Sequence, residues 1–168
     1  MKLNVFRSLA ALITILSLTA AAIAAESATP EEVIAKVKEA ASYIAANGDS
    51  VLPEFNDPEG PWVWKDTYVF VMDCPNDRYA GHPMASVMDT KISEIVDYAG
   101  NRVGLTECRM SEENPKGAWV EIMWPQLGQT TPERKICYVL KLRGLSYTVG
   151  SGIYEPTMTM EELNALIK

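Results

Sequence analysis

The chain has a single histidine, His82, and three cysteines, and neither residue type is arranged as metal or nucleophilic sites usually are. No Cys-x-x-Cys pair is present, which argues against a zinc site and against covalently attached haem. A serine or cysteine nucleophile needs a neighbouring base, and only His82 could provide an imidazole. Cys74 precedes it by eight residues, but a small apolar cysteine at a strand end explains that position more simply. We therefore expect no catalytic residues, no metal and no cofactor, and hence no enzyme.

Other signs of charged-ligand sites are missing as well. The sequence has no glycine-rich phosphate loop, and Asp73, Asn76 and Asp77 lack the glycine and the twelfth-position glutamate of an EF-hand calcium loop. Cations are scarce, because 15 Lys plus Arg stand against 22 Asp plus Glu, for a formal net charge of −7. An acidic chain is a poor partner for nucleic acid or for an anionic membrane, so we expect neither.

Only one long apolar run occurs, and it lies at the N-terminus. Leu9 to Leu18 follows two cations and precedes Ala22-Ile23-Ala24, the small-x-small pattern that a signal peptidase reads. This predicts a signal peptide over residues 1–25 and a periplasmic or secreted protein. Because Leu9 to Ala25 is 17 residues, close to the lower limit for a spanning helix, an uncleaved anchor in the inner membrane is the alternative.

The chain that remains after cleavage has about 143 residues, enough for one domain with its own hydrophobic core. Loss of two cations makes its net charge about −9. Its three cysteines, Cys74, Cys108 and Cys137, would meet an oxidising compartment. One disulfide with a free thiol and no disulfide at all both fit the sequence.

The first structured element should be a long helix from Pro30. Thr29 is its candidate N-cap and forms a Thr-x-x-Glu capping box with Glu32, while an apolar stripe recurs at three- and four-residue spacing up to Ile44. Asn47-Gly48 ends it. A short second helix, capped by Asp49 or Ser50, should run through Phe55 into a dense turn at residues 56–61.

Strands follow this turn. A run of aromatic and β-branched residues from Asp66 to Asp73 predicts a strand whose two faces are both covered, and residues 74–77 form a turn into the arm Arg78 to Pro83. More than thirty mixed residues then precede the next strand, which usually marks a functional excursion. Within it we expect a short turn capped by Asp89 or Thr90 and a weaker helix from Arg102 to Glu113. Later strands are expected at 118–124, 135–142 and 145–154, and a capping box at Thr159 begins a C-terminal helix.

This order of elements predicts an α+β fold of the PAS-like kind, and six sequence pieces carry a closer resemblance. In order and spacing the chain resembles single Cache domains of bacteria and archaea. The pieces are Phe55 to Pro58, Tyr68 to Val71, His82-Pro83, Trp119 to Pro125, Lys135 with Tyr138-Val139, and Val149 to Tyr154.

The resemblance implies an extracytoplasmic sensor fold, with a PAS-like antiparallel sheet of five to six strands packed on the long N-terminal helix. It implies a single Cache domain over residues 26–156, followed by a short C-terminal helix over 157–168, and a pocket between the other sheet face and the loop after the second strand. Such domains bind small organic acids and serve chemoreceptors or histidine kinases. Since this chain ends shortly after the domain, signalling or chemotaxis would need a separate membrane partner. Met84 to Thr90 departs from the Asn and Gly-Lys that related domains often carry after His-Pro.

A carboxylate in an aromatic pocket needs a fixed cation or several neutral donors. Our candidate ligand-binding residues supply a charge (Lys135), donors (Tyr68, His82 and Tyr138) and apolar walls (Trp64 and Trp124). Each has a structural alternative: Lys135 could be solvated at a strand start, His82 could bond a loop carbonyl, and the aromatic residues could be core. Alternation puts Lys135 and Tyr138 on opposite faces unless a bulge intervenes.

Two functions fit the sequence. The first is a sensor-type module that binds a small organic acid. The second is a structural or interaction module that kept the fold but lost the pocket, and that uses a tryptophan-rich surface for homodimerisation or partner contact.

Overall fold

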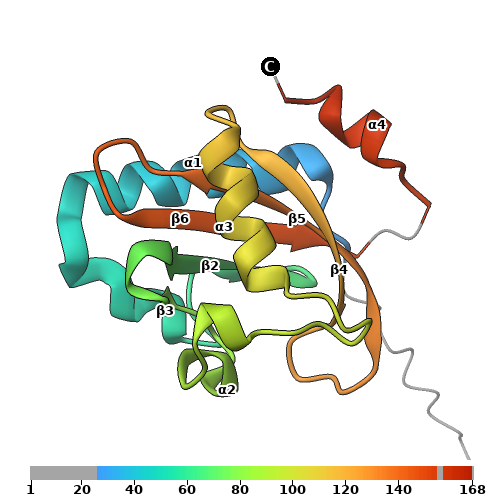
Figure 1. The fold of residues 1–168 in the computed structure, drawn as a ribbon, viewed down its shortest axis with the longest axis horizontal. Coiled ribbons are helices and arrows are strands. Elements are labelled where there is room, and N and C mark those ends of the chain that lie inside the picture. Colours follow the sequence, from blue (N-terminus) through green and yellow to red (C-terminus); the bar gives the residue numbers. More distant parts are fainter. Residues whose placement is uncertain (1–25, 155–156, 168) are drawn as a thin grey trace, which may run out of the picture.

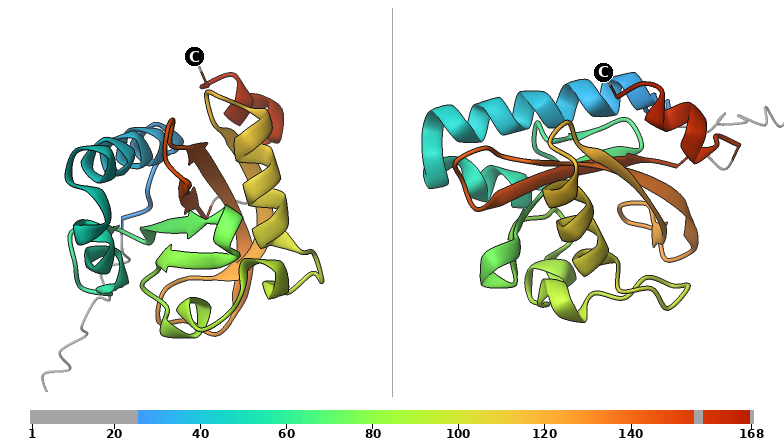
Figure 2. Two further views of the ribbon diagram at one scale, coloured as in Figure 1. Left: turned by 60° about the vertical axis from the view of Figure 1, so that its left-hand side comes forward. Right: turned by 45° about the horizontal axis from the view of Figure 1, so that its top comes forward.

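A six-stranded antiparallel sheet lies between a long helix on one face and two shorter helices with their loops on the other (Figures 1 and 2). The computed structural model describes residues 26–154 and 157–167, so the predicted signal peptide lies outside the described residues. The expected α+β architecture is confirmed. Within the described ranges, no helix is both long and apolar enough to cross a membrane.

Helix α1 (Pro30–Asn47) begins as its sequence predicts. Thr29 accepts a hydrogen bond from the Glu32 backbone N–H, and the Glu32 side chain accepts one from Thr29 in return. Gly48 ends the helix in left-handed backbone, with φ of 68°. The second helix is a 3₁₀ helix, η1 (Gly48–Asn56), that starts without a side-chain cap, so the expected cap at Asp49 or Ser50 is wrong.

The strand order is β1-β2-β6-β5-β4, and β3 pairs with the remaining part of β2. The last strand, β6, pairs with β2 in register Phe70↔Gly150 and thereby joins the two ends of the domain. Strand β5 begins at Pro132, so Lys135 lies inside it rather than at its start. The strand bounds are β1 (Val63–Trp64), β2 (Thr67–Asp73), β3 (Arg78–Gly81), β4 (Ala118–Pro125), β5 (Pro132–Lys141) and β6 (Tyr147–Ile153).

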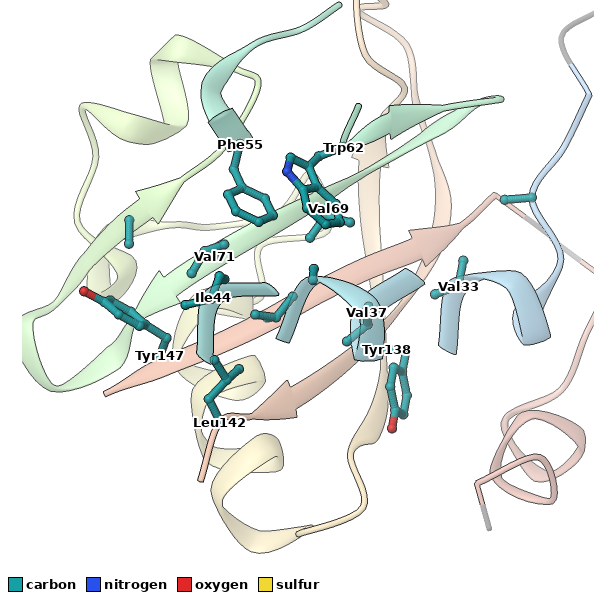
Figure 3. Packing of buried hydrophobic residues seen from close by; sticks show 14 of the residues in the cluster. Val33, Val37, Ile44, Phe55, Trp62, Val69, Val71, Tyr138, Leu142 and Tyr147 are labelled. Atoms are coloured by element: carbon teal, nitrogen blue, oxygen red, sulfur yellow. The ribbon is translucent and has the colours of Figure 1, made fainter. Parts of the chain in front are cut away.

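The face that α1 covers holds the larger core. Side chains from α1, η1 and five strands meet there, and Figure 3 shows Val37, Ile44, Val71 and Tyr138 among them. Phe55 stacks on Trp62 with ring centroids 4.6 Å apart. Because alternate residues of a strand face opposite sides, this packing also decides which strand residues face away from α1.

The excursion after β3 covers the opposite face. It contains α2 (Ala85–Met88), the 3₁₀ helix η3 (Ile92–Glu94) and α3 (Val103–Glu113). The predicted helix from Arg102 to Glu113 is thus confirmed within one residue, while α2 was not expected. The predicted turn before Ile92 exists, but neither Asp89 nor Thr90 caps it, because Lys91 occupies the N-cap position and makes no side-chain bond there.

The C-terminal segment returns to the edge of the sheet. Helix α4 (Met160–Asn164) begins with the predicted capping box, in which Thr159 and Glu162 bond reciprocally. Leu163 is fully buried, and Trp119 donates its Nε1 hydrogen to the Leu163 carbonyl at 3.0 Å. The helix therefore covers the indole of a β4 residue at the margin of the α1-side core.

Candidate functional site

A pocket opens on the sheet face that α3 covers. Its cavity volume is about 20 Å³, about the space that one water molecule needs, and the pocket is partly open to solvent. Strands β2 to β5, α3 and the loops before α3 provide its walls. The residues lining it are Tyr68, Phe70, Tyr79, His82, Ile95, Val103, Glu107, Ile122, Trp124, Lys135 and Cys137.

Lys135 is the cation of this pocket. It is 1% exposed, and alternation along β5 directs it and Cys137 toward α3 while Ile136 and Tyr138 face α1. Its Nζ lies 3.9 Å from the centroid of the Tyr68 ring and 5.1 Å from that of Tyr154. Both rings present their electron-rich faces to the ammonium, which stabilises the charge.

Gly152 on β6 makes room for the Lys135 side chain. A Cβ at this position would lie 2.8 Å from Lys135 Cε, closer than carbon atoms can approach. At Gly150 a Cβ would collide with the Phe70 ring. The two strand glycines therefore mark close approach by side chains of this face.

The surroundings of Lys135 keep it charged. Burial disfavours the ammonium, but the neighbouring Tyr154, Tyr68 and Cys137 outweigh it and raise the pKa of Lys135 above its ordinary value. At neutral pH, where the phenols and the thiol are uncharged, the faces of the Tyr68 and Tyr154 rings stabilise the ammonium. It then disfavours a second positive charge in the same pocket.

His82 is the neutral partner of this cation. Burial, and then the nearby Lys135 charge, hold the pKa of His82 well below its usual range. Its Nδ1 accepts the backbone N–H of Met84 at 3.0 Å, so the neutral ring carries its proton on Nε2. The Tyr68 and Tyr79 rings meet it edge-on, with centroids 5.0 and 5.6 Å away. His82 thus offers one fixed N–H donor among aromatic walls.

Glu107 on α3 is the polar residue that sequence reasoning missed. It is 3% exposed and lines the pocket with one carboxyl oxygen, Oε1, that has no hydrogen-bond partner. Its carboxyl group also shares a hydrogen bond with the Cys137 thiol. Burial raises the pKa of Glu107 to about 7, although Lys135 and the Cys137 hydrogen bond oppose that shift.

Two predicted site residues lie elsewhere. Tyr138 faces α1, where its hydroxyl donates to the Lys116 carbonyl at 2.5 Å (Figure 3), because β5 runs without a bulge through this region. Trp64 packs against the same α1-side core. The other four, Tyr68, His82, Trp124 and Lys135, line one pocket. Tyr154, the residue after β6, contributes a second ring beside Lys135.

A disulfide and a buried aspartate fix the roof of the pocket. Cys74, directly after β2, is bonded to Cys108 on α3, next to Glu107, while Cys137 is free and buried. Asp97 accepts hydrogen bonds from the backbone N–H groups of Ala99, Asn101 and Met123. The loop before α3 is thereby tied to β4, and the helix to β2.

Residues 2–165 of the chain match the family described as single Cache domain 2. The chain belongs to the single Cache domain family. The resemblance drawn from the six sequence pieces is thus confirmed. No curated protein sequence matches this Cache domain.

Three solved structures share its fold. One is a Cache chemosensory domain that recognises carboxylic acid, with 21% identity, a TM-score of 0.56, and coverage of 72% of this chain and 85% of that one. Another is the periplasmic sensor domain of a chemotaxis protein, with 22% identity, a TM-score of 0.55 and coverage of 72% and 87%. The third is a methyl-accepting chemotaxis protein from Vibrio parahaemolyticus, with 18% identity, a TM-score of 0.57, and coverage of 74% of this chain and 86% of that one.

Proposed function

We propose that this Cache domain is an extracytoplasmic sensor module that binds a small carboxylic acid at Lys135 and does no chemistry on it. Lys135 carries the argument. It is a buried ammonium, and within the part of the chain that the structure describes no carboxylate lies within ion-pair distance of it. A buried charge without a counter-charge costs several kcal/mol. A bound carboxylate would supply the missing counter-charge.

The neutral groups around Lys135 suit the same ligand. The Nε2 hydrogen of His82 and the hydroxyl of Tyr68 can donate to carboxylate oxygens, and Phe70, Ile122 and Trp124 offer apolar walls to a short carbon chain. The carboxylic acid recognised by a Cache domain of the same fold supports this ligand class. The size of the pocket restricts the acid to a few carbon atoms.

The rest of the proposal concerns the cellular setting. Residues 1–25 would direct the chain to the periplasm or outside the cell, residues 26–156 would form the sensor domain, and a separate membrane receptor or kinase would read its ligand state. The alternative interaction module required a tryptophan-rich surface. All four tryptophans are buried or half-buried, which favours ligand binding over that alternative.

Replacement of Lys135 by methionine tests the proposal. The change keeps the length of the side chain and removes its charge, so the fold should persist. Loss of a charged hydrogen bond should weaken acetate and propionate binding about ten- to a hundredfold. Titration calorimetry measures this directly. In a thermal-shift screen a ligand at about a hundred times its dissociation constant should raise the melting temperature of the wild type by several degrees.

Lys38→Met, on the exposed side of α1, is the matched control and should leave affinity unchanged. Acid binding that ignores Lys135→Met would place the site elsewhere. If no C2 to C6 acid shifts the melting temperature of the folded protein, the proposed function is wrong.

A further inference from the structure

The pocket has a second polar end, which a simple carboxylic acid does not use. Glu107 projects from α3 into the pocket and is 3% exposed. Its Oε1 is one of only two buried side-chain oxygen or nitrogen atoms in the described ranges without a hydrogen-bond partner, the other being Trp62 Nε1 in the α1-side core. A buried acceptor left without a donor costs about 1–3 kcal/mol. An acceptor that lines a ligand pocket can recover this energy from a donor on the ligand.

Glu107 and Lys135 do not satisfy each other. No ion pair joins them, although both line the same pocket, and the cation instead faces the rings of Tyr68 and Tyr154. The pocket thus presents a donor charge and an acceptor group that remain separate. A ligand lying between them would meet a cation at one end and a hydrogen-bond acceptor at the other.

We propose that the pocket selects a short carboxylic acid that also carries a hydrogen-bond donor, an ammonium or a hydroxyl, near its carboxylate. The carboxylate lies at Lys135 and the donor at Glu107 Oε1. This inference rests on the proposed function, because it uses Lys135 as the carboxylate site. The small cavity volume, about 20 Å³, favours the smallest such acids, with two or three carbon atoms, and the lining side chains must move apart to admit them.

The protonation state of Glu107 separates this ligand class from plain acids. A plain monocarboxylate would add a negative charge beside Glu107 and would bind best when Glu107 is protonated. An ammonium on the ligand needs Glu107 to be ionised. Each charge of the ligand then lies beside an opposite buried charge, its carboxylate at Lys135 and its ammonium at Glu107. Since burial raises the pKa of Glu107 to about 7, the two kinds of ligand should respond oppositely to pH across neutrality.

The other titratable groups facing the pocket do not confuse this response. They come from β2, β3, the loop after β3, β5 and the residue after β6, namely Tyr68, Tyr79, His82, Lys135, Cys137 and Tyr154. Burial raises the pKa of Tyr79, Cys137 and Tyr154. The pKa of Lys135 is raised and that of His82 lowered, so these five groups move away from neutrality.

Calorimetric titration of acetate, glycolate and glycine at pH 6 and pH 8.5 tests the inference with three variants. The three acids share a two-carbon skeleton and differ only in the donor. Glu107→Gln removes the charge and keeps an acceptor, and Glu107→Met removes both. Glu113→Gln, exposed on the same helix, is the control. Circular dichroism establishes that each variant is folded.

We expect glycine or glycolate to bind at least tenfold more tightly than acetate at pH 8.5, because the donor adds one hydrogen bond to a charged group. If the donor is an ammonium, Glu107→Gln should abolish the advantage. If it is a hydroxyl, Gln should preserve it and only Met should abolish it. Glu113→Gln should change nothing.

Acetate affinity equal to that of both substituted acids, unaffected by Glu107→Met, would overturn the inference and leave the proposed function intact. If neither these acids nor propionate nor lactate binds, both the inference and the proposed function are wrong. Weaker acetate binding at pH 8.5 than at pH 6 in the wild type, but not in Glu107→Met, would show that Glu107 faces the ligand.

Discussion

At the scale of single residues, the site depends on two polar side chains that the fold buries. Lys135 lies on β5 opposite Ile122 of β4, and its ammonium persists because two aromatic rings face it. Glu107 lies on a helix whose buried residues are Val103, Gly104, Glu107 and Ser111, two of them polar. A helix with so weak an apolar stripe gives little sign of which residues are buried. Both residues therefore bear a stability penalty that only a ligand or a proton relieves.

Glu107 should make the stability of the ligand-free protein depend on pH. Its pKa is about 7 in the folded state against about 4.5 when exposed, so between these values the folded protein holds a proton that the unfolded chain has lost. The stability that depends on this proton is fully present below pH 4.5 and is lost as pH rises to about 7. The free energy of unfolding should fall by about 3 kcal/mol over this window on account of Glu107 alone.

Urea denaturation of the wild type and of Glu107→Gln from pH 4.5 to 8.5 measures this pH dependence of the free energy of unfolding. The difference between the two curves isolates Glu107, because carboxyl groups with lowered pKa values, such as Asp97 and Glu121, contribute equally to both. The variant should match the wild type near pH 4.5 and exceed it at pH 8. Parallel curves would mean that Glu107 titrates normally and is solvated.

At the scale of elements, α3 is one wall of the pocket and the disulfide is its anchor. The Cys74–Cys108 bond joins α3 to the end of β2 across 34 residues of sequence. Ser111 adds a hydrogen bond of 3.0 Å to Thr148 on β6. These two attachments set the position of α3, and with it that of Glu107, because the apolar face of the helix is too weak to fix the helix alone.

Removal of the disulfide should loosen this wall. The double variant Cys74→Ser/Cys108→Ser should lose about 3–4 kcal/mol of stability, the chain-entropy value for a loop of this length. Ligand affinity should weaken as well, since α3 carries part of the lining. Urea denaturation measures the stability, and calorimetry measures the ligand affinity. A reductant should reproduce the effect in the wild type and leave the double variant unchanged; a stable, full-affinity double variant would contradict this role.

At the scale of the whole molecule, the sheet separates the larger core from the face that holds the pocket. The α1-side core includes Trp119, Tyr138 and Phe55, three of the largest fully buried side chains, and is closed at its margin by α4. The other face contains the cavity, Lys135 and Glu107. Stability and ligand binding should therefore respond to different substitutions.

Leu163→Ala tests this separation. It removes the fully buried anchor of α4, and stability should fall by about 2 kcal/mol, at the low end for a buried leucine because the short helix can undock instead of leaving a cavity. Exposure of Trp119 should shift tryptophan fluorescence to longer wavelength. Ligand affinity should not change. Leu105→Ala, at a side chain that is 44% exposed, is the control, and a loss of affinity in Leu163→Ala would show that the two faces are coupled.

The sequence by itself determined the helix start at Thr29, the strands, the excursion and the family, because caps, periodicity and ordered motifs are properties of short segments. It also placed Tyr68, His82, Trp124 and Lys135 among the candidates. Tertiary structure decided which face of β5 met the pocket, excluded Tyr138 and Trp64, paired Cys74 with Cys108 and buried Glu107. The physical reason is that alternation fixes which residues share a face, whereas only packing against distant elements decides what covers that face.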